Sequence, residues 1–275
     1  MEHACNAAGN IAARREHRTP ARSVVGVRQV WRRRAGLSYN LSVLPKRTDT
    51  SAWEITQPTT RREQMRARAV AEIPGWYSPW GHLAFPSVVG LGMIACAVAL
   101  LEHPTPLELL VVPLVLALIN LNEWHIHRSI LHQRTWPLEI LFWRHTPEHH
   151  VIFVRDDMAM RATREFRLVL IPFYGILAIF VTALPITAAL WFLVSHNVAL
   201  LWVASVMGYV VAYEWLHLSY HLPASNPIGR SGLIRWLRSH HAMHHTPELM
   251  QRWNFNVTVP LADLVLGTIY RGQRR

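Results

Sequence analysis

The chain has 275 residues, and it combines a formal net charge of +11 with 51% hydrophobic residues and a positive mean hydropathy of +0.12. This hydrophobic content is high for a soluble protein, whereas long apolar runs separated by basic segments are typical of a membrane protein whose arginines lie at the lipid headgroups. The two cysteines, Cys5 and Cys96, are far apart and match no metal-binding spacing, so the sequence indicates neither a disulfide framework nor a thiolate metal site.

Residues 1–70 form a basic, arginine-rich segment without hydrophobic periodicity, and they include the runs RQVWRRRAG and RREQMRAR. Such a charge run predicts a disordered tail. Nucleic-acid binding is the weaker interpretation, because no recognisable binding motif accompanies the charge and a membrane surface attracts the same residues. Met65 is an alternative start, which would make residues 1–64 an over-extended reading frame. In either case residues 71–275 are expected to form the functional domain.

An aromatic stretch precedes the first apolar run. The sequence PGWYSPWGH at 74–82 contains Trp76, Tyr77 and Trp80, which suit the interface between a membrane and water. Apolar runs follow at 83–101 and 107–121, separated by a short turn with two prolines. Each run approaches the length that a helix needs to cross the hydrocarbon core, so the pair predicts a transmembrane hairpin.

A second hairpin is predicted after a polar segment. Apolar runs lie at 166–184 and 198–213, and a further apolar piece at 186–194 follows Pro185. This piece either lengthens the third helix or re-enters the membrane. The predicted fold is therefore all-α: an integral membrane protein with four transmembrane helices in two hairpins and a cytoplasmic, helical, histidine-rich cap.

The distribution of arginine predicts the sidedness of these helices. The N-terminal segment, residues 125–165 and residues 216–275 all contain arginine, whereas the turns at 102–106 and 185–197 contain neither arginine nor lysine. By the positive-inside rule, both termini and the central polar segment are expected in the cytoplasm. The histidine-rich segments would then lie on the cytoplasmic side of a multi-pass membrane protein.

Histidine clustering is the main functional signal. Of the seventeen histidines, twelve fall into four groups near the predicted cytoplasmic ends of the helices. Neutral imidazole is the commonest metal-binding side chain, so the four groups together predict a metal site. The groups are His125, His127 and His132; His145, His149 and His150; His217 and His221; and His240, His241, His244 and His245.

The spacing within the groups leaves alternatives open. His217 and His221 share one helical face, although an isolated pair is equally explained by hydrogen-bonded interfacial histidines. His127 and His132 are five residues apart, about 140° on an ideal helix, so they require a local bend or bind different metals. Adjacent histidines in the second group point about 100° apart, which favours two metal ions side by side.

A Glu-Trp pair precedes the first and third groups. Glu123 lies four residues before His127, and Glu214 lies three residues before His217. The repetition is either a faint internal echo or chance. The two glutamates are also candidates for acceptors that orient imidazole N–H groups.

The order of the motifs HRSILH, HTPEHH, HLSYH and HAMHH, followed by WNF and DLVLGT, resembles the fatty acid hydroxylase superfamily, which includes sterol desaturases. The resemblance covers roughly residues 80–271. It implies a non-haem di-iron enzyme that uses O2 to insert a hydroxyl group or a double bond into the alkyl chain of a lipid, such as a fatty acyl or sterol-like substrate. The implied cofactors are two iron ions, and the implied partners are the membrane and a separate electron donor, a reductase with a ferredoxin or a cytochrome b5-like protein.

The same resemblance implies a ligand set, position by position. His240 has the spacing to His244 that His145 has to His149, so it competes with His241 for one ligand role. Asn256 stands where the family usually has glycine, a replacement that a left-handed backbone would accept. The implied ligands are His127, His132, His145, His149, His150, His217, His221, His241, His244 and His245.

The alternative hypothesis is a histidine-rich membrane protein that binds or transports metal without oxygenase activity. A transporter is expected to place polar or ionisable residues along a path through its spans. The predicted spans are almost purely apolar and the histidines stay on one side, which favours the enzyme.

Overall fold

A computed structural model describes residues 60–223 and 225–272 of the chain. The described part is helical and contains no strand beyond an isolated bridge between Val154 and Asp157. Residues 1–59, on which most of the predicted tail falls, lie outside the described residues.

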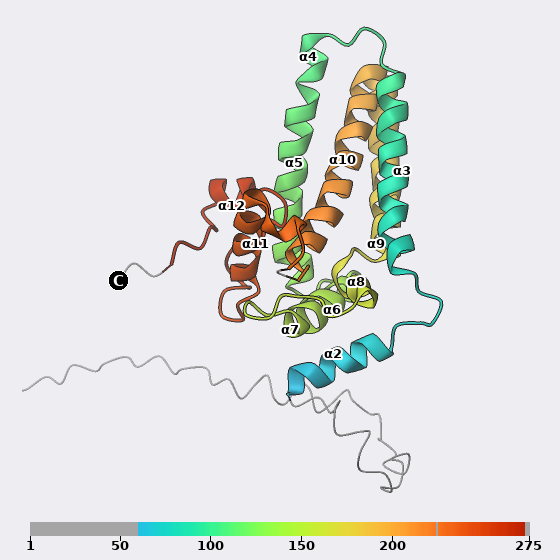
Figure 1. The fold of residues 1–275 in the computed structure, drawn as a ribbon. Coiled ribbons are helices and arrows are strands. Elements are labelled where there is room, and N and C mark those ends of the chain that lie inside the picture. The colour runs from blue at the N-terminus through green and yellow to red at the C-terminus, as the bar shows by residue number, and fades with distance from the viewer. Residues whose placement is uncertain (1–59, 224, 273–275) are drawn as a thin grey trace, which may run out of the picture. The chain divides into compact units, whose positions relative to one another are not determined.

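Four helices are long and apolar enough to cross a membrane, which confirms the prediction of an all-α fold with four spans (Figure 1). The spans are α3 (Pro79–Ala99); α4 (Pro106–Leu109) with α5 (Val111–Ile126) and the π-helix η2 (His127–Leu131); α9 (Phe173–Leu193); and α10 (His196–Tyr220).

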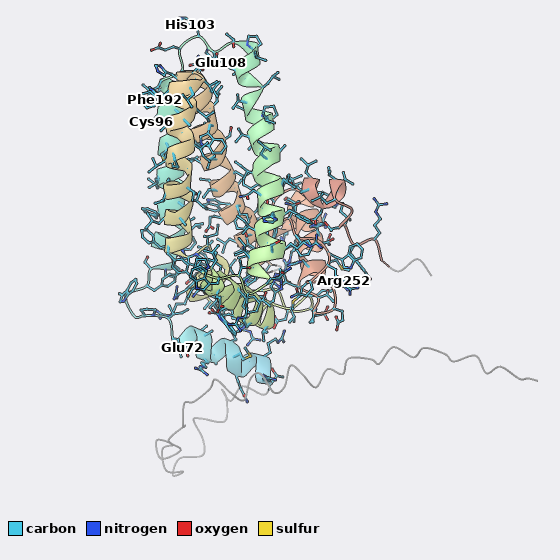
Figure 2. All side chains as sticks on the ribbon, turned by 180° about the vertical axis from the view of Figure 1, so that it is seen from behind. Glu72, Cys96, His103, Glu108, Phe192 and Arg252 are labelled. Atoms are coloured by element: carbon cyan, nitrogen blue, oxygen red, sulfur yellow. The ribbon has the colours of Figure 1, made fainter. Side chains whose placement is uncertain are left out.

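The two turns between paired spans meet at one end of the helices. Thr105 caps α4 in a capping box with Glu108, and Ser195 caps α10 by accepting a hydrogen bond from the backbone N–H of Val198. The Ser195 hydroxyl also donates to Glu108 Oε1 at 2.6 Å, and Asn197 Nδ2 donates to the carbonyl of Glu102 at 2.8 Å. Figure 2 shows His103 and Glu108 at this end, far from Glu72 and Arg252.

The third span begins later than predicted. It starts at Phe173 and not near residue 166, because Leu170 and Pro172 have extended backbones that separate it from the short helix α8 (Phe166–Val169). A residue before proline avoids the helical region, which explains the break at Ile171. Pro185 lies inside α9, so residues 186–193 lengthen the third helix, as one of the two alternatives predicted.

Helix α10 is the central span. It packs against α3, α5 and α9, and its apolar window is far more buried than that of α9. The approach to α3 is close: a Cβ atom on Gly90 would lie 2.6 Å from Cγ2 of Val211, so the contact requires glycine. Val206 and Met207 of α10 pack with Val115 of α5 in a shared core. The central position of α10 fixes where its C-terminal histidines lie.

Short helices gather at the opposite end from the two turns (Figure 1). Between α5 and α8 the chain forms turns and short segments, and after α10 it forms another set that packs on α5 and α10. The elements are α6 (Glu139–Arg144), the π-helix η3 (His145–His149), α7 (His150–Ile152), η4 (Thr163–Glu165), η5 (Ile228–Arg230), α11 (Gly232–His244) and α12 (Leu261–Val265).

The predicted tail is wrong at its C-terminal end, because α2 (Arg61–Ala71) is a packed helix. Arg66 is only 4% exposed and forms an ion pair of 3.0 Å with Glu165. Its guanidinium also donates to the carbonyl of Ile152 and lies 4.9 Å from the centre of the Phe153 ring. The folded domain therefore includes residues that the charge pattern assigned to the tail, and a start at Met65 would remove the first turn of α2.

Candidate metal centre

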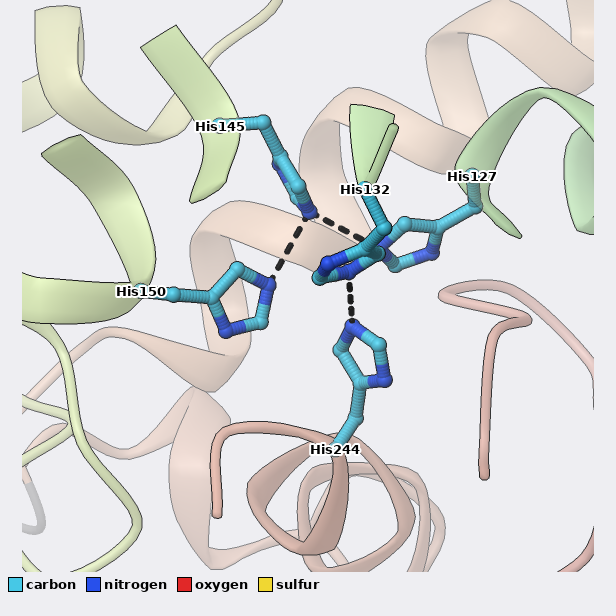
Figure 3. Close-up of side chains that lie close together, drawn as sticks. All are labelled: His127, His132, His145, His150 and His244. Carbon is cyan, nitrogen blue, oxygen red and sulfur yellow. Dashed lines mark hydrogen bonds between the residues drawn. The ribbon is translucent and has the colours of Figure 1, made fainter. Parts of the chain in front are cut away.

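Two histidine clusters lie side by side where α5 and α10 end. The structure buries all ten predicted ligands and brings nine of them into two groups, each able to hold a metal ion. Within each group the candidate ligand atoms lie within 4.8 Å of one another. The five-histidine cluster contains His127, His132, His145, His150 and His244 (Figure 3), and the four-histidine cluster contains His149, His217, His221 and His241.

A π-turn brings His127 and His132 together. An ideal α-helix would point them about 140° apart. The chain instead forms η2, in which the backbone N–H of His132 bonds to the carbonyl of His127 at 3.2 Å. One turn then takes an extra residue, and the two rings stack with centroids 5.1 Å apart. This turn is the local bend that the spacing predicted.

A second π-turn acts in the same way on His145 and His150. In η3 the backbone N–H of His150 bonds to the carbonyl of His145, and the Nε2 atoms of the two rings approach to 3.0 Å. His149 points the other way and joins the four-histidine cluster. Adjacent histidines therefore serve different clusters, which is the arrangement expected for two ions side by side.

The last two helices complete both clusters. His217 and His221 lie one α-helical turn apart on α10 and both face the four-histidine cluster. On α11, His241 belongs to that cluster, whereas His244 belongs to the other. His245 is the tenth predicted ligand and lies between them: its Nε2 is 3.0 Å from His241 Nε2, and its ring stacks on His150 at 4.2 Å.

Backbone carbonyls orient half of these imidazoles. A carbonyl can only accept, so each Nδ1 carries the proton and each Nε2 presents a lone pair to the cluster. Metal-binding histidines are commonly oriented in this way. The pairs are His149 Nδ1 with Leu168 (2.8 Å), His221 Nδ1 with Met158 (2.8 Å), His244 Nδ1 with Trp253 (2.9 Å), His245 Nδ1 with Phe153 (2.5 Å), and His127 Nδ1 with Phe255.

The nitrogens that face the cluster centres suit a cation. The Nε2 atoms of His149, His217 and His221 are buried and have no hydrogen-bond partner. A buried acceptor without a partner costs about 1–3 kcal/mol, and a metal ion at the centre would satisfy several at once. Imidazole nitrogens without thiolates suit iron, manganese or zinc. The residues therefore fit a pair of transition-metal ions.

Burial keeps these imidazoles in the form that binds metal. Loss of solvation and the neighbouring histidines lower the pKa of His132 to about 2. Burial likewise lowers the pKa of His149 to about 4, although its bond to the Leu168 carbonyl opposes the shift. The pKa values of His150 and His245 also lie well below the ordinary range for histidine, mainly because of burial. Neutral imidazole is the ligand form, so the clusters are ready for metal at neutral pH.

Acid is expected to destabilise the metal-free protein. An unfolded histidine titrates near 6.5, but folded His132 and His149 have much lower pKa values, so below that pH the unfolded chain takes up protons that the folded chain does not. For each of these residues the free energy of unfolding should fall by up to about 1.4 kcal/mol per pH unit. Denaturant unfolding of chelator-treated protein between about pH 7.5 and pH 5 measures this loss. A flat profile would contradict the burial of the imidazoles.

Asp263 holds in place the backbone segment that bonds to His127. Its carboxylate accepts hydrogen bonds from the backbone N–H groups of Phe255 and Asn256 at 3.0 and 2.8 Å, and from Thr268 Oγ1 at 2.6 Å. Burial raises the pKa of Asp263, but these bonds and the one from His240 outweigh it, so the pKa lies below its usual value. Asp263 thus fixes the segment whose Phe255 carbonyl orients His127.

His240 lies outside both clusters. Its Nε2 is 3.1 Å from Asp263 Oδ2, while His241 faces the four-histidine cluster. The geometry therefore favours His241 in the competition between these neighbours. The expectation for Asn256 is corrected as well: the left-handed residue is Asn254, with φ 58°, and Asn256 does not have a positive φ.

Neither glutamate of the Glu-Trp pairs is bonded to a histidine among the described residues. Glu123 accepts hydrogen bonds from the backbone N–H groups of Val257 and Thr258 and from the hydroxyl of Tyr209. Glu214 accepts from the backbone N–H of Ile171 at 3.1 Å. Glu123 therefore holds the segment that follows the last histidines, and Glu214 holds the backbone just before α9. Sequence spacing alone could not show either role.

No family model matches the chain, and searches of curated proteins and of solved structures gave no match.

Proposed function

We propose that this protein is a membrane-bound non-haem di-iron oxygenase that inserts a hydroxyl group or a double bond into the alkyl chain of a lipid. The observation that carries the proposal is the pair of adjacent, buried clusters built from histidine alone. Two irons held there would supply the O2 activation that an unactivated C–H bond requires, chemistry beyond side-chain acids and bases. The histidine motifs that resemble the fatty acid hydroxylase superfamily support the same reaction class.

The protein's own residues set the conditions for this chemistry. The carbonyls of Phe255, Leu168 and Met158 hold imidazoles on both clusters, so the ligand geometry is fixed before metal binds. Phe153 is fully buried and packs against His149 and His221, with ring centroids 5.2 and 4.7 Å away. These apolar contacts keep water from the four-histidine cluster.

A lipid is the substrate that fits this location. The clusters lie at the ends of α5 and α10, and α5 exposes Leu114, Leu118 and Leu121 on its outer side. An alkyl chain in the bilayer could therefore reach the clusters along an apolar surface. The arginine distribution supports a cytoplasmic position for this end, where a separate reductase with a ferredoxin or cytochrome b5-like protein would deliver electrons.

Iron content and oxygen uptake test the proposal together. Protein expressed with iron and purified in nanodiscs should contain about two irons per chain, and O2 consumption should require both a reductant and a lipid with a long alkyl chain. Mass spectrometry of the lipid should then find an added oxygen or the loss of two hydrogens. Metal binding without lipid-dependent uptake would instead support a metal-binding or transport protein. Less than about one metal per chain would contradict both.

A further inference from the structure

The segment that follows the last histidines has an unusual composition. Residues 253–270, WNFNVTVPLADLVLGTIY, contain no lysine, arginine, glutamate or histidine, and their one carboxylate, Asp263, is fully buried. Arg252 precedes the segment and Arg271 follows it, and both are exposed. An apolar segment with a basic residue at each end is typical of chain that enters a membrane from the headgroup region.

The outer surface of this segment is apolar. Its exposed large side chains are all aliphatic, although it lies outside the four spans. An exposed apolar patch of this kind on a protein surface indicates contact with a membrane or with another protein. The exposed residues are Val259 (58%), Leu261 (43%), Leu264 (56%), Val265 (74%) and Leu266 (45%).

Contacts with α5 give the depth of the segment. Asn120 Nδ2 donates to the carbonyl of Val259 at 2.7 Å, and Asn120 Oδ1 accepts from the backbone N–H of Ala262 at 2.9 Å. Along the second span Asn120 lies twelve residues from Glu108, about 18 Å, and seven residues before His127, about 10 Å. A hydrocarbon core is about 30 Å thick, so the level of Asn120 falls inside it. Figure 1 shows α12 beside α5, on the side of α11 that faces the α4 end.

Protein groups accept hydrogen bonds from most backbone N–H groups of the segment, as hydrocarbon requires. Asp263 accepts from the N–H groups of Phe255 and Asn256, and Glu123 accepts from those of Val257 and Thr258. Where the segment enters and leaves, the Thr268 carbonyl accepts from the N–H of Asn254, and Asn254 Oδ1 from that of Tyr270. These bonds remove most of the penalty for placing irregular backbone in a bilayer.

Aromatic side chains mark the level at which the segment leaves the membrane. The rings of Trp253 and Tyr270 meet edge to face with centroids 6.0 Å apart, next to Arg252 and Arg271. Tryptophan and tyrosine are enriched at the headgroup level, with arginine just outside it. Arg252 and Arg271 thus match the headgroup level, and Trp253 and Tyr270 match the interface. The exposed aliphatic residues between 259 and 266, the tip of the segment, match the hydrocarbon.

We propose that residues 253–270 form a re-entrant segment whose exposed tip contacts lipid acyl chains beside α5. The exposed Leu116 lies one turn before Asn120, which bonds to the segment, and residues 111–122 of α5 include no charged side chain. The apolar surface of α5 beside the segment therefore indicates that lipid acyl chains are what the segment contacts. The centre then lies at the border of the hydrocarbon, because the carbonyl of Phe255 in this segment orients His127. The proposal holds whether or not the clusters perform oxygenase chemistry.

Site-directed bimane labelling in nanodiscs tests this assignment. In full-length protein with Cys5→Ser and Cys96→Ala, single cysteines are placed by Val265→Cys at the tip, Leu118→Cys on the lipid face of α5, and Glu248→Cys on an exposed polar turn. Bimane at 265 should be quenched by acyl-brominated phospholipid as strongly as at 118, and its quenching by aqueous iodide should be several-fold weaker than at 248.

Two outcomes would overturn the proposal. Strong iodide quenching at 265 with little quenching by brominated lipid would place the tip in water. Protection from both quenchers would mean that protein covers it, and the oligomeric state of the labelled sample would show whether the cover is a second copy of the chain. Leu264→Cys places the label at a second exposed position of the same segment, so the comparison can still be made if the Val265→Cys variant does not fold.

Discussion

Replacing His241 with alanine is expected to lower bound metal from about two ions per chain to about one and to abolish lipid-dependent oxygen uptake. His241 is fully buried in the four-histidine cluster, and its loss leaves three ligands there while the five-histidine cluster keeps all of its own. The affinity loss should exceed the roughly 10- to 100-fold that follows removal of a group that merely orients a ligand. Elemental analysis and metal titration of the purified variant measure both quantities.

The neighbouring residue provides the matched control. His240→Ala removes an imidazole from the same helix, but that imidazole bonds to Asp263 and faces neither cluster. We expect two ions to remain, with an affinity lowered by no more than roughly 10-fold through the weaker support of the Asp263 segment. Equal metal loss in both variants would show that the effect is structural, and greater loss in His240→Ala would reverse the assignment.

Replacing Arg66 with alanine is expected to lower the free energy of unfolding by about 3–5 kcal/mol. The change leaves the buried carboxylate of Glu165 without its cation, and it also removes the donor to the Ile152 carbonyl. Ile152 lies two residues after His150 and three after His149, which belong to the two clusters. Chemical denaturation in detergent measures the stability, and metal content measured alongside shows whether the damage reaches the centre.

Arg68→Ala on the same helix is the control for this effect. Its ion pair with Glu72 is largely exposed, and such pairs contribute less than about 1 kcal/mol. A similar loss from both variants would mean that α2 contributes through its helical stability and not through the buried pair. If Arg66→Ala instead left the free energy of unfolding unchanged, the inclusion of α2 in the folded domain would be contradicted.

Sequence reasoning predicted the helices that are set by composition. The spans followed from run length, since an apolar stretch of that size has few other folds. It placed the start of the third span too early because Phe166, Leu168 and Val169 are apolar despite the intervening Arg167, and the extended backbone that separates α8 from α9 leaves no mark in the apolar pattern. The central place of α10 was not predicted, although its mean hydropathy of 1.5 is the lowest of the four spans and that of the least buried span, α9, is the highest at 2.3.

What the sequence could not predict about the metal site and about Arg66 has a different cause. An ideal helix separates His127 from His132, and in the π-turn that unites them both rings contact residues far away in the chain, His127 the carbonyl of Phe255 and His132 the ring of His244. Likewise, nothing in the pattern RREQMRAR distinguishes buried Arg66 from exposed Arg68. Local periodicity describes one helix, whereas these residues are placed by contacts between several.

The two π-turns also predict how the sequence can vary among relatives of this chain. Each turn accommodates four residues between its paired histidines, and Arg128 within the first is exposed to solvent. Deleting one intervening residue would rotate everything beyond it by about 100° and shift it by about 1.5 Å, carrying ligands out of both clusters. Substitutions at exposed positions such as Arg128 should therefore be tolerated, whereas insertions and deletions between the paired histidines should be absent from functional descendants.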